Sequence, residues 1–268
     1  VEKVIDWSSA TNLGTSGTYE FAAGEGKVVK INGLKYYIEN TNTSSAQTLT
    51  YSTDENGQIT FQNDGGGVVG NIIVTAADGQ VDNICVSGGI TVWAGDMNDT
   101  IVGVTKGSVY GGFGDDSISV ELAASYGNIK GNDGNDIIEL RGLSAPTPAS
   151  CSIDGGNGSD TLYNLSSNPS ITTSNIETTY SYIDGGTSGS IFGKSETVKI
   201  GDNYYDIDAQ MGELTWSLNE TTGEITFNYD QEDGRCTITA HSGQEDNVIL
   251  EGEQIYFYAG DKNDTIVN

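Results

Sequence analysis

The chain has 268 residues, of which 38 are acidic and 11 are basic, for a formal net charge of −27. This charge excludes nucleic acid as an expected partner, because phosphate binding requires a basic surface. Acidic composition alone is compatible with disorder, but 14 tyrosines, 3 tryptophans and many β-branched residues supply the apolar surface of a folded β protein. No apolar run approaches membrane-spanning length, so membrane insertion is not expected either.

Residues 1–78 predict an antiparallel β segment. One hairpin is expected over Val28–Ile38 around Asn32-Gly33, and a second over Leu49–Phe61 around Glu55-Asn56-Gly57. Asn-Gly pairs between strand-like runs favour hairpin turns. No stretch of the chain shows a convincing helical period, and the predicted fold class is therefore all-β.

A Gly/Asn/Asp turn followed by a short strand then recurs four times between Trp93 and Tyr163. The turns are Ala94-Gly95-Asp96-Met97-Asn98-Asp99, Gly111-Gly112-Phe113-Gly114-Asp115-Asp116, Gly131-Asn132-Asp133-Gly134-Asn135-Asp136 and Gly155-Gly156-Asn157-Gly158-Ser159-Asp160. Each closing aspartate directly precedes a trio with an apolar middle residue. Generic Gly/Asn/Asp hairpin turns are the alternative, but they would not keep this frame.

The closing aspartates Asp99, Asp116, Asp136 and Asp160 are separated by steps of 17, 20 and 24 residues. A full turn of a β-roll takes about 18 residues, so the motif recurs once per turn. We therefore predict a one-sided parallel β-roll, a β-solenoid with motif turns on one edge and ordinary loops of varying length on the other. Asp82, 17 residues before Asp99, is expected to close a first degenerate turn.

The chemistry of these turns favours a hard cation. Glycines allow positive φ and close backbone approach, while carbonyl and aspartate oxygens are the ligands that Ca²⁺ prefers. Stacked turns without an ion would bring carboxylates close together, where like charges repel. Calcium between successive turns would remove that repulsion.

The end of the chain repeats the beginning. Gly14-Thr15-Ser16-Gly17 returns as Gly186-Thr187-Ser188-Gly189, and the Gly95–Val102 stretch returns from Gly260 to Val267. The offset falls from 172 to 165 residues, which indicates a module of roughly 170 residues present once in full and about half again. The expected segments are an antiparallel part over 1–78, a roll over 79–195, a second antiparallel part over 196–241 and the start of a second roll over 242–268. A fragment of a longer repeat array is the interpretation that this arrangement favours.

Catalytic signatures are missing from the sequence. It contains no HExxH, GxSxG or CxxC motif, and no enzyme activity is expected. The single histidine, His241, aligns with Ala77 of the first copy and is expected at a surface or strand position. Cys85, Cys151 and Cys236 lie in apolar alternations and are expected to be small buried side chains rather than a disulfide framework.

The turns resemble the nonapeptide G-G-x-G-x-D-x-U-x of the RTX proteins, the calcium-binding β-roll family. The resemblance covers about 82–163 and 246–267. It implies Ca²⁺ as the cofactor, held by closing aspartates and by oxygens of the turn positions. Carried over residue by residue, the implied metal ligands are Asp82, Ala94, Asp96, Asp99, Gly112, Gly114, Asp116, Gly131, Asn132, Asp133, Gly134, Asp136, Gly156, Asn157, Gly158, Asp160, Asp261 and Asp264.

The resemblance also implies a secreted, extracellular bacterial protein. The favoured function is a calcium-stiffened structural or adhesive module of a long cell-surface protein, with calcium ions, neighbouring copies of the module or a cell-surface ligand as partners. The alternative is an export-and-folding module of a secreted enzyme or toxin whose active domain lies outside this chain. Sugar binding through exposed aromatic residues is a third, weaker reading.

Overall fold

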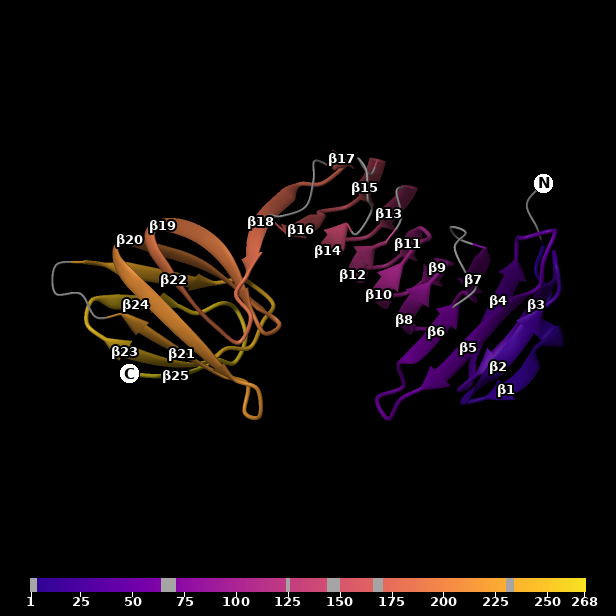
Figure 1. The fold of residues 1–268 in the computed structure, drawn as a ribbon, viewed down its shortest axis with the longest axis horizontal. Coiled ribbons are helices and arrows are strands. Elements are labelled where there is room, and N and C mark those ends of the chain that lie inside the picture. Colours follow the sequence, from indigo (N-terminus) through magenta and orange to yellow (C-terminus); the bar gives the residue numbers. More distant parts are fainter. Residues whose placement is uncertain (1–3, 64–70, 124–125, 144–149, 166–170, 230–233) are drawn as a thin grey trace. The chain divides into compact units, whose positions relative to one another are not determined.

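The computed structural model describes residues 4–63, 71–123, 126–143, 150–165, 171–229 and 234–268. Within these ranges the chain is built of β-strands, apart from a 3-10 turn over Trp7–Ser9. The prediction of an all-β solenoid is confirmed (Figure 1). Among the described residues no helix is long and apolar enough to cross a membrane.

The chain divides into two compact units, Val1–Thr179 and Tyr180–Asn268. Residues 180–195, which the sequence assigns to the first roll, belong to the second unit. Each unit has its own hydrophobic core.

The solenoid of unit 1 consists of two parallel sheets, whose strands alternate along the chain (Figure 1). In the first sheet lie β7 (Ile72–Ala76), β9 (Ile90–Asp96), β11 (Val109–Phe113), β13 (Tyr126–Asp133), β15 (Ser150–Asn157) and β17 (Thr172–Ser174). In the second sheet lie β6 (Ile59–Asn63), β8 (Asn83–Gly88), β10 (Thr100–Thr105), β12 (Ser117–Leu122), β14 (Ile137–Leu143) and β16 (Thr161–Leu165). We call the successive strand pairs from β7/β8 to β15/β16 the rungs.

Register between rungs is set by rows of identical or similar aliphatic residues. In the second sheet the row is Ile84, Ile101, Ile118, Ile138 and Leu162, and in the first it is Val74, Val92, Val109, Ile129 and Ile153. All of these side chains are fully buried in one common core. Because side chains alternate between the faces of a strand, a slip of one residue would expose a whole row.

Unit 1 begins with a mainly antiparallel cap over residues 11–63, in which only the β1–β3 pair is parallel among the described cap pairings. The cap comprises β1 (Thr11–Gly14), β2 (Ser16–Phe21), β3 (Gly26–Ile31), β4 (Leu34–Asn40), β5 (Gln47–Thr53) and β6. Both predicted hairpins are confirmed, as β3–β4 and β5–β6. Asn32 and Gly33 have φ of 47° and 89° at the first bend, as a tight hairpin turn requires.

Unit 2 contains a cap of the same kind, built from fewer and longer strands, over residues 188–229. Its strands are β19 (Ser188–Ile200), β20 (Asn203–Asn219) and β21 (Glu224–Tyr229). β20 is antiparallel to β19, to β21 and to β22 (Cys236–Ala240). Parallel pairing follows. β23 (Asn247–Gly252) pairs with β21 and with β25 (Thr265–Val267), and β22 pairs with β24 (Ile255–Tyr258). β18 (Thr178–Asp184) pairs in parallel with β19.

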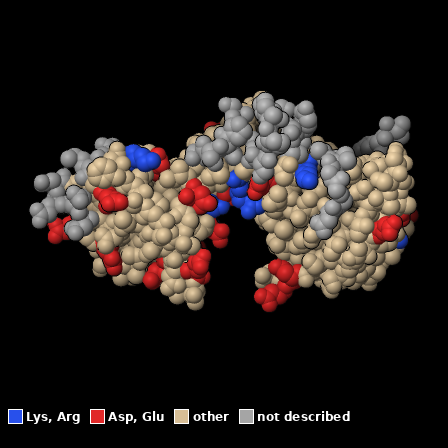
Figure 2. Space-filling view, viewed as in Figure 1, with Lys and Arg blue, Asp and Glu red and all other residues tan. Residues whose placement is uncertain are grey.

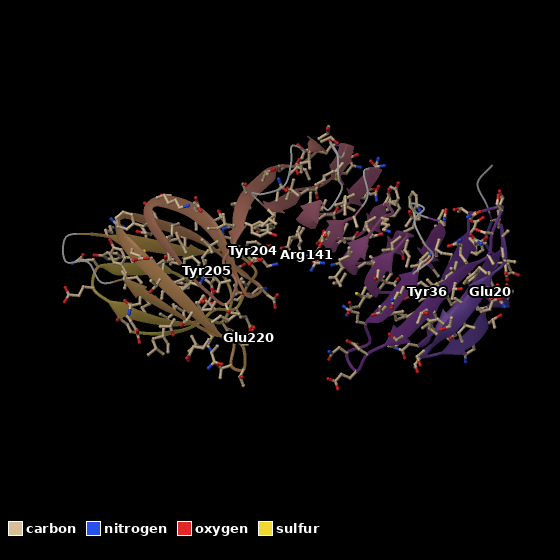
Figure 3. All side chains as sticks on the ribbon, in the orientation of Figure 1. Glu20, Tyr36, Arg141, Tyr204, Tyr205 and Glu220 are labelled. Atoms are coloured by element: carbon tan, nitrogen blue, oxygen red, sulfur yellow. The ribbon has the colours of Figure 1, made fainter. Side chains whose placement is uncertain are left out.

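The duplication read from the sequence is also visible in the packing. Tyr36 lies edge-on to Phe61 at 5.2 Å and 76°, and Tyr205 lies edge-on to Phe227 at 5.3 Å and 76°. All four rings are fully buried. Each cap is therefore organised around the same aromatic pair, and Figure 3 labels Tyr36 and Tyr205 on their strands β4 and β20.

Candidate metal centre

The closing aspartates of unit 1 form a continuous buried ladder along one edge of the solenoid. Oδ1 of each accepts a hydrogen bond from the backbone N–H of the preceding one, at 2.8 Å for each step between Asp82, Asp99, Asp116, Asp136 and Asp160. The five residues are at most 2% exposed. The backbone carbonyl of each aspartate in turn accepts a hydrogen bond from the residue that follows the aspartate of the next rung. Ser117 N, for example, follows Asp116 and donates to Asp99 O. The aspartates therefore lock the rungs together.

The second oxygen of these carboxylates has no hydrogen-bond partner. Oδ2 of Asp99, Asp116, Asp136 and Asp160 is buried and unpaired. A buried ionised oxygen without a partner carries a large desolvation cost. Strands in a sheet are about 5 Å apart, where two like charges repel by about 3 kcal/mol at an effective dielectric constant of about 20. The ladder as it stands therefore demands a cation or a proton.

Three of the ladder carboxylates, those of Asp116, Asp136 and Asp160, lie against glycine backbone. A Cβ added at Gly131 would lie 1.9 Å from Oδ2 of Asp136 and 2.5 Å from the carbonyl oxygen of Gly155. The same arrangement recurs one turn earlier, with Gly111, Asp116 and the carbonyl of Gly131. Each of these cradles therefore brings a carboxylate oxygen near a backbone carbonyl where a Cβ would not fit, whereas the turn that closes at Asp99 has Ala94 at this position.

Burial raises the pKa of every carboxylate in the ladder. The pKa of Asp99 rises to about 8, that of Asp116 to about 7, and those of Asp82 and Asp136 to about 6. Desolvation is the largest cause, and the neighbouring carboxylates add to it. The ladder N–H groups act in the opposite direction, because they stabilise the charged form.

Other glycines of the predicted ligand set serve close stacking of the turns. Gly112, Gly114, Gly134, Gly156 and Gly158 have φ between 111° and 145°. An added Cβ at any of them would come within 1.7–2.2 Å of a carbonyl oxygen in the preceding turn. The carbonyl oxygens of Asn132, Gly114 and Gly134 are among those that contact the glycine of the next turn. They therefore point toward the neighbouring turn rather than toward one shared ion position.

The remaining predicted ligands of unit 1 lie outside the buried ladder. Oδ1 of Asp96 accepts from Gly79 N, and Oδ1 of Asp133 accepts from Asn157 Nδ2 at 2.6 Å. Asp96 and Asp133 are half-buried, and Asn157 is exposed. Ala94 is a fully buried core residue of β9. Asp96 and Asp133 lie close enough to raise the pKa of Asp99 and Asp136, but among the described residues they form no metal-binding group of three acidic side chains with the ladder.

A second, exposed ladder runs beside the buried one. Oδ1 of Asn98 accepts from Asp115 N at 3.0 Å, Oδ1 of Asp115 from Asn135 N at 2.7 Å, and Oδ1 of Asn135 from Ser159 N at 2.9 Å. The residue before each closing aspartate thus ties the turns together from outside. The sequence shows this position in every motif, but its role was not predicted.

The buried ladder provides the donor chemistry for calcium. It offers hard oxygens, one carboxylate oxygen per turn without a partner, and neighbouring glycine carbonyls, which suit Ca²⁺. No group of three acidic, histidine or cysteine side chains that could hold a metal occurs among the described residues. An ion would therefore be held by single carboxylates and backbone carbonyls, at Asp99, Asp116, Asp136 and Asp160.

Asp82, also predicted as a ligand, has a different environment. Its Oδ1 accepts from Tyr36 OH at 2.5 Å and from Gln80 Nε2 at 3.0 Å, and its Oδ2 accepts from Gln80 Nε2 at 3.1 Å. Both oxygens are thus satisfied by side chains. We call Tyr36, Gln80 and Asp82 the clamp. The sequence offered a signal for it that was missed, since Gln80-x-Asp82 returns as Gln244-x-Asp246.

The other end of the ladder also has a residue that the sequence analysis missed. Oε2 of Glu177 accepts from the backbone N–H of Asp160 at 2.7 Å. Glu177 lies 17 residues after Asp160, the same step that separates Asp99 from Asp116. A longer carboxylate there continues the ladder without a glycine turn.

Unit 2 repeats the start of the ladder. Oδ1 of Asp264 accepts from Asp246 N at 3.0 Å, as Asp99 does from Asp82. Asp261 accepts from Gly243 N at 2.6 Å, as Asp96 does from Gly79. Asp246 is buried and Asp264 half-buried.

Other candidate residues lie apart from the ladder. His241 is buried rather than on the surface and follows β22, so the expected surface or strand position was wrong. Its Nε2 lies 3.0 Å from Oδ1 of Asp206, and this hydrogen bond lowers the pKa of Asp206. Trp93 and Tyr110 stack face to face at 3.7 Å and 9° on the outside of β9 and β11, so each ring covers one face of the other.

The view in Figure 2 shows acidic side chains scattered over both units. The ladder carboxylates are buried and add nothing to this surface. The chain matches no family of known proteins, no curated protein and no solved structure. The function therefore has to be argued from the ladder itself.

Proposed function

We propose that this chain is a calcium-binding structural module, a β-solenoid that is stiffened by ions along its buried aspartate ladder. The observation that carries this proposal is the row of four buried carboxylates whose Oδ2 atoms have no partner, three of which, at Asp116, Asp136 and Asp160, lie beside glycine backbone. Protons could neutralise such a row only at the cost of ionisable groups held far from their ordinary pKa. Calcium neutralises it with the ligand type that the turns supply.

The module's role in this proposal is mechanical and adhesive. Rungs locked by two parallel ladders resist separation along the solenoid axis, and the internal duplication gives a repeating unit. An extracellular location follows from the same proposal, since a calcium-dependent solenoid is stable where calcium is abundant. The resemblance of the turns to RTX repeats supports both points.

A calcium titration of the full chain tests this function. Metal-stripped protein is titrated with Ca²⁺, and with Mg²⁺ as control, while far-UV circular dichroism and thermal unfolding are recorded. We expect β signal and melting temperature to rise with Ca²⁺ and to change far less with Mg²⁺, which demands a stricter octahedral site. Identical unfolding with and without Ca²⁺ would overturn the proposal.

A further inference from the structure

Each ladder starts at a carboxylate that is held by side-chain donors rather than by an open cradle. In unit 1 these donors are Tyr36 OH and Gln80 Nε2 on Asp82. In unit 2 Oδ1 of Asp246 accepts from Tyr205 OH at 2.7 Å, from Gln244 Nε2 at 2.8 Å and from Asn203 Nδ2 at 3.0 Å. The same chemistry is thus built twice at the same place in the fold.

The donors are fixed in position by the caps. Oε1 of Gln80 accepts from the backbone N–H of Lys35 at 2.9 Å, and its Nε2 donates to the Lys35 carbonyl at 3.1 Å. In unit 2, Oε1 of Gln244 accepts from Tyr204 N at 2.8 Å. Each tyrosine is fully buried against a phenylalanine of the same cap. The glutamine therefore joins the cap hairpin to the first carboxylate.

Further along the ladder of unit 1 no such donors occur in the described structure. Oδ2 of Asp99, Asp116 and Asp136 has no partner, whereas both oxygens of Asp82 are bonded. Asp246 is intermediate, with three donors on Oδ1 and none on Oδ2. Hydrogen bonds to a carboxylate favour its charged form without any ion.

We infer that the tyrosine–glutamine clamp takes the place of calcium at the first carboxylate of each ladder, so that the caps fold without the ion. This inference rests on the proposed function. The cap core of unit 1 supports it independently, because Phe21, Tyr36, Tyr51 and Phe61 bury large aromatic side chains there, and aromatic burial is the largest single contribution to a core. The rungs bury smaller aliphatic residues and contain many glycines with positive φ. Ordering these glycines on folding costs more backbone entropy than ordering other residues.

The cap and the rungs of one unit therefore differ in their dependence on calcium. The cap is a metal-independent nucleus, and the rungs from β11 onward need calcium. Asp82 is then a ladder residue but not a metal ligand, which removes one residue from the ligand set predicted from the sequence.

Hydrogen exchange of the full chain, read by mass spectrometry with and without Ca²⁺, separates these regions. We expect equal protection of cap strands β3–β6 in both conditions, and protection of β11–β16 only with Ca²⁺. If β11–β16 ignore calcium, the proposed function fails. If β11–β16 respond and the cap responds equally, the proposed function stands and the clamp inference fails.

Variants of the clamp give the sharper result. Tyr36→Phe with Gln80→Leu removes the donors on the side chain of Asp82, so the cap should now exchange about 10-fold faster without Ca²⁺ and recover with it. Tyr51→Phe is the matched control, since its buried hydroxyl bonds to the Leu13 carbonyl at 2.9 Å, away from the ladder. This control should loosen the cap equally in both conditions.

A double variant that behaves like Tyr51→Phe, loosened to the same degree with and without Ca²⁺, would overturn the inference. Tyr36→Phe alone serves if the double variant does not fold, with the same pattern at smaller amplitude. Tyr205→Phe repeats the test in unit 2, where exchange of β20 and β22 is read.

Discussion

The caps are antiparallel and packed around aromatic pairs, whereas the rungs of unit 1 are parallel and packed around rows of isoleucine and valine. In the caps, hydroxyl and indole groups donate to the buried oxygens of Asp82, Asp246 and Gly185. In the rungs, carboxylates and glycine backbone meet instead, and one oxygen per turn stays unpaired. The two regions thus depend on different forces, and the rungs present a row of unpaired carboxylate oxygens that an ion could neutralise.

The two caps also show which contacts the architecture needs. A Cβ at Gly17 would clash with the hydroxyl of Tyr51, and a Cβ at Gly189 with the ring of Trp216. Tyr51 OH donates to the Leu13 carbonyl, and Trp216 Nε1 donates to the Gly185 carbonyl at 3.1 Å. A large aromatic donor over a glycine is therefore retained although the aromatic residue differs.

The largest effect is expected for a methyl group between rungs. At Gly134→Ala the Cβ would lie 1.9 Å from the Gly114 carbonyl oxygen at φ of 144°, so the turns must separate, at a cost of about 3 kcal/mol in the free energy of unfolding. Gly33→Ala in the cap has positive φ but nothing within 4 Å, and should cost only about 1 kcal/mol. Urea unfolding measures both, and equal losses would contradict the stacking role of the rung glycines.

Next in size is the exchange of the aromatic donors in the caps. Trp216→Phe loses buried volume and the bond to Gly185, which should lower the free energy of unfolding by about 2 kcal/mol. Tyr51→Phe loses only its hydroxyl bond and should cost about 1 kcal/mol. Thermal unfolding of the full chain reports both, and a neutral Trp216→Phe would show that the two caps are not equivalent.

The pH dependence of the metal-stripped protein should come mainly from the rungs. Burial raises the pKa of Asp99 to about 8 and that of Asp116 to about 7, from an ordinary value of 3.8. The folded state therefore binds more protons than the unfolded state between about pH 4 and 8, and stability falls as pH rises through this window. Urea midpoints at pH 5 and pH 8 measure it. With Ca²⁺ bound the slope should flatten or reverse, and a metal-stripped protein more stable at pH 8 would contradict this account.

The smallest effect is expected on the outer face of the rungs. Lys130 and Asp154 form an ion pair at 3.6 Å with both side chains partly exposed. Exposed pairs contribute about 0–1 kcal/mol, so Lys130→Ala should shift the melting temperature by no more than about 2 °C. A larger loss of melting temperature in calorimetry would mean that this pair stabilises the rungs more than an exposed ion pair is expected to.

Much of this organisation was predictable from local sequence signals. The hairpins at Asn32-Gly33 and Glu55-Asn56-Gly57, the duplication and the row of closing aspartates all follow from turn chemistry and spacing. The clamp was not predictable, because Tyr36 meets Asp82 across 46 residues through tertiary packing. The sequence likewise could not separate Asp133, which lies outside the ladder, from Asp136 three residues later, which lies within it.

The central claim is that a carboxylate in the buried ladder needs a cation. Asp116→Asn keeps the Oδ1 atom that accepts from Asp99 N and places an amide donor near the Gly131 carbonyl, while Asp115→Asn changes the exposed neighbour in the same turn. Unfolding of both variants with and without Ca²⁺ is the most direct measurement. We expect Asp116→Asn to be more stable than the parent chain by about 1–3 kcal/mol in the metal-stripped state at pH 8 and to gain less from Ca²⁺, with a clearly smaller change in both respects for Asp115→Asn, whose charge acts on Asp116 only from the exposed side. Equal behaviour of the two variants would contradict the account.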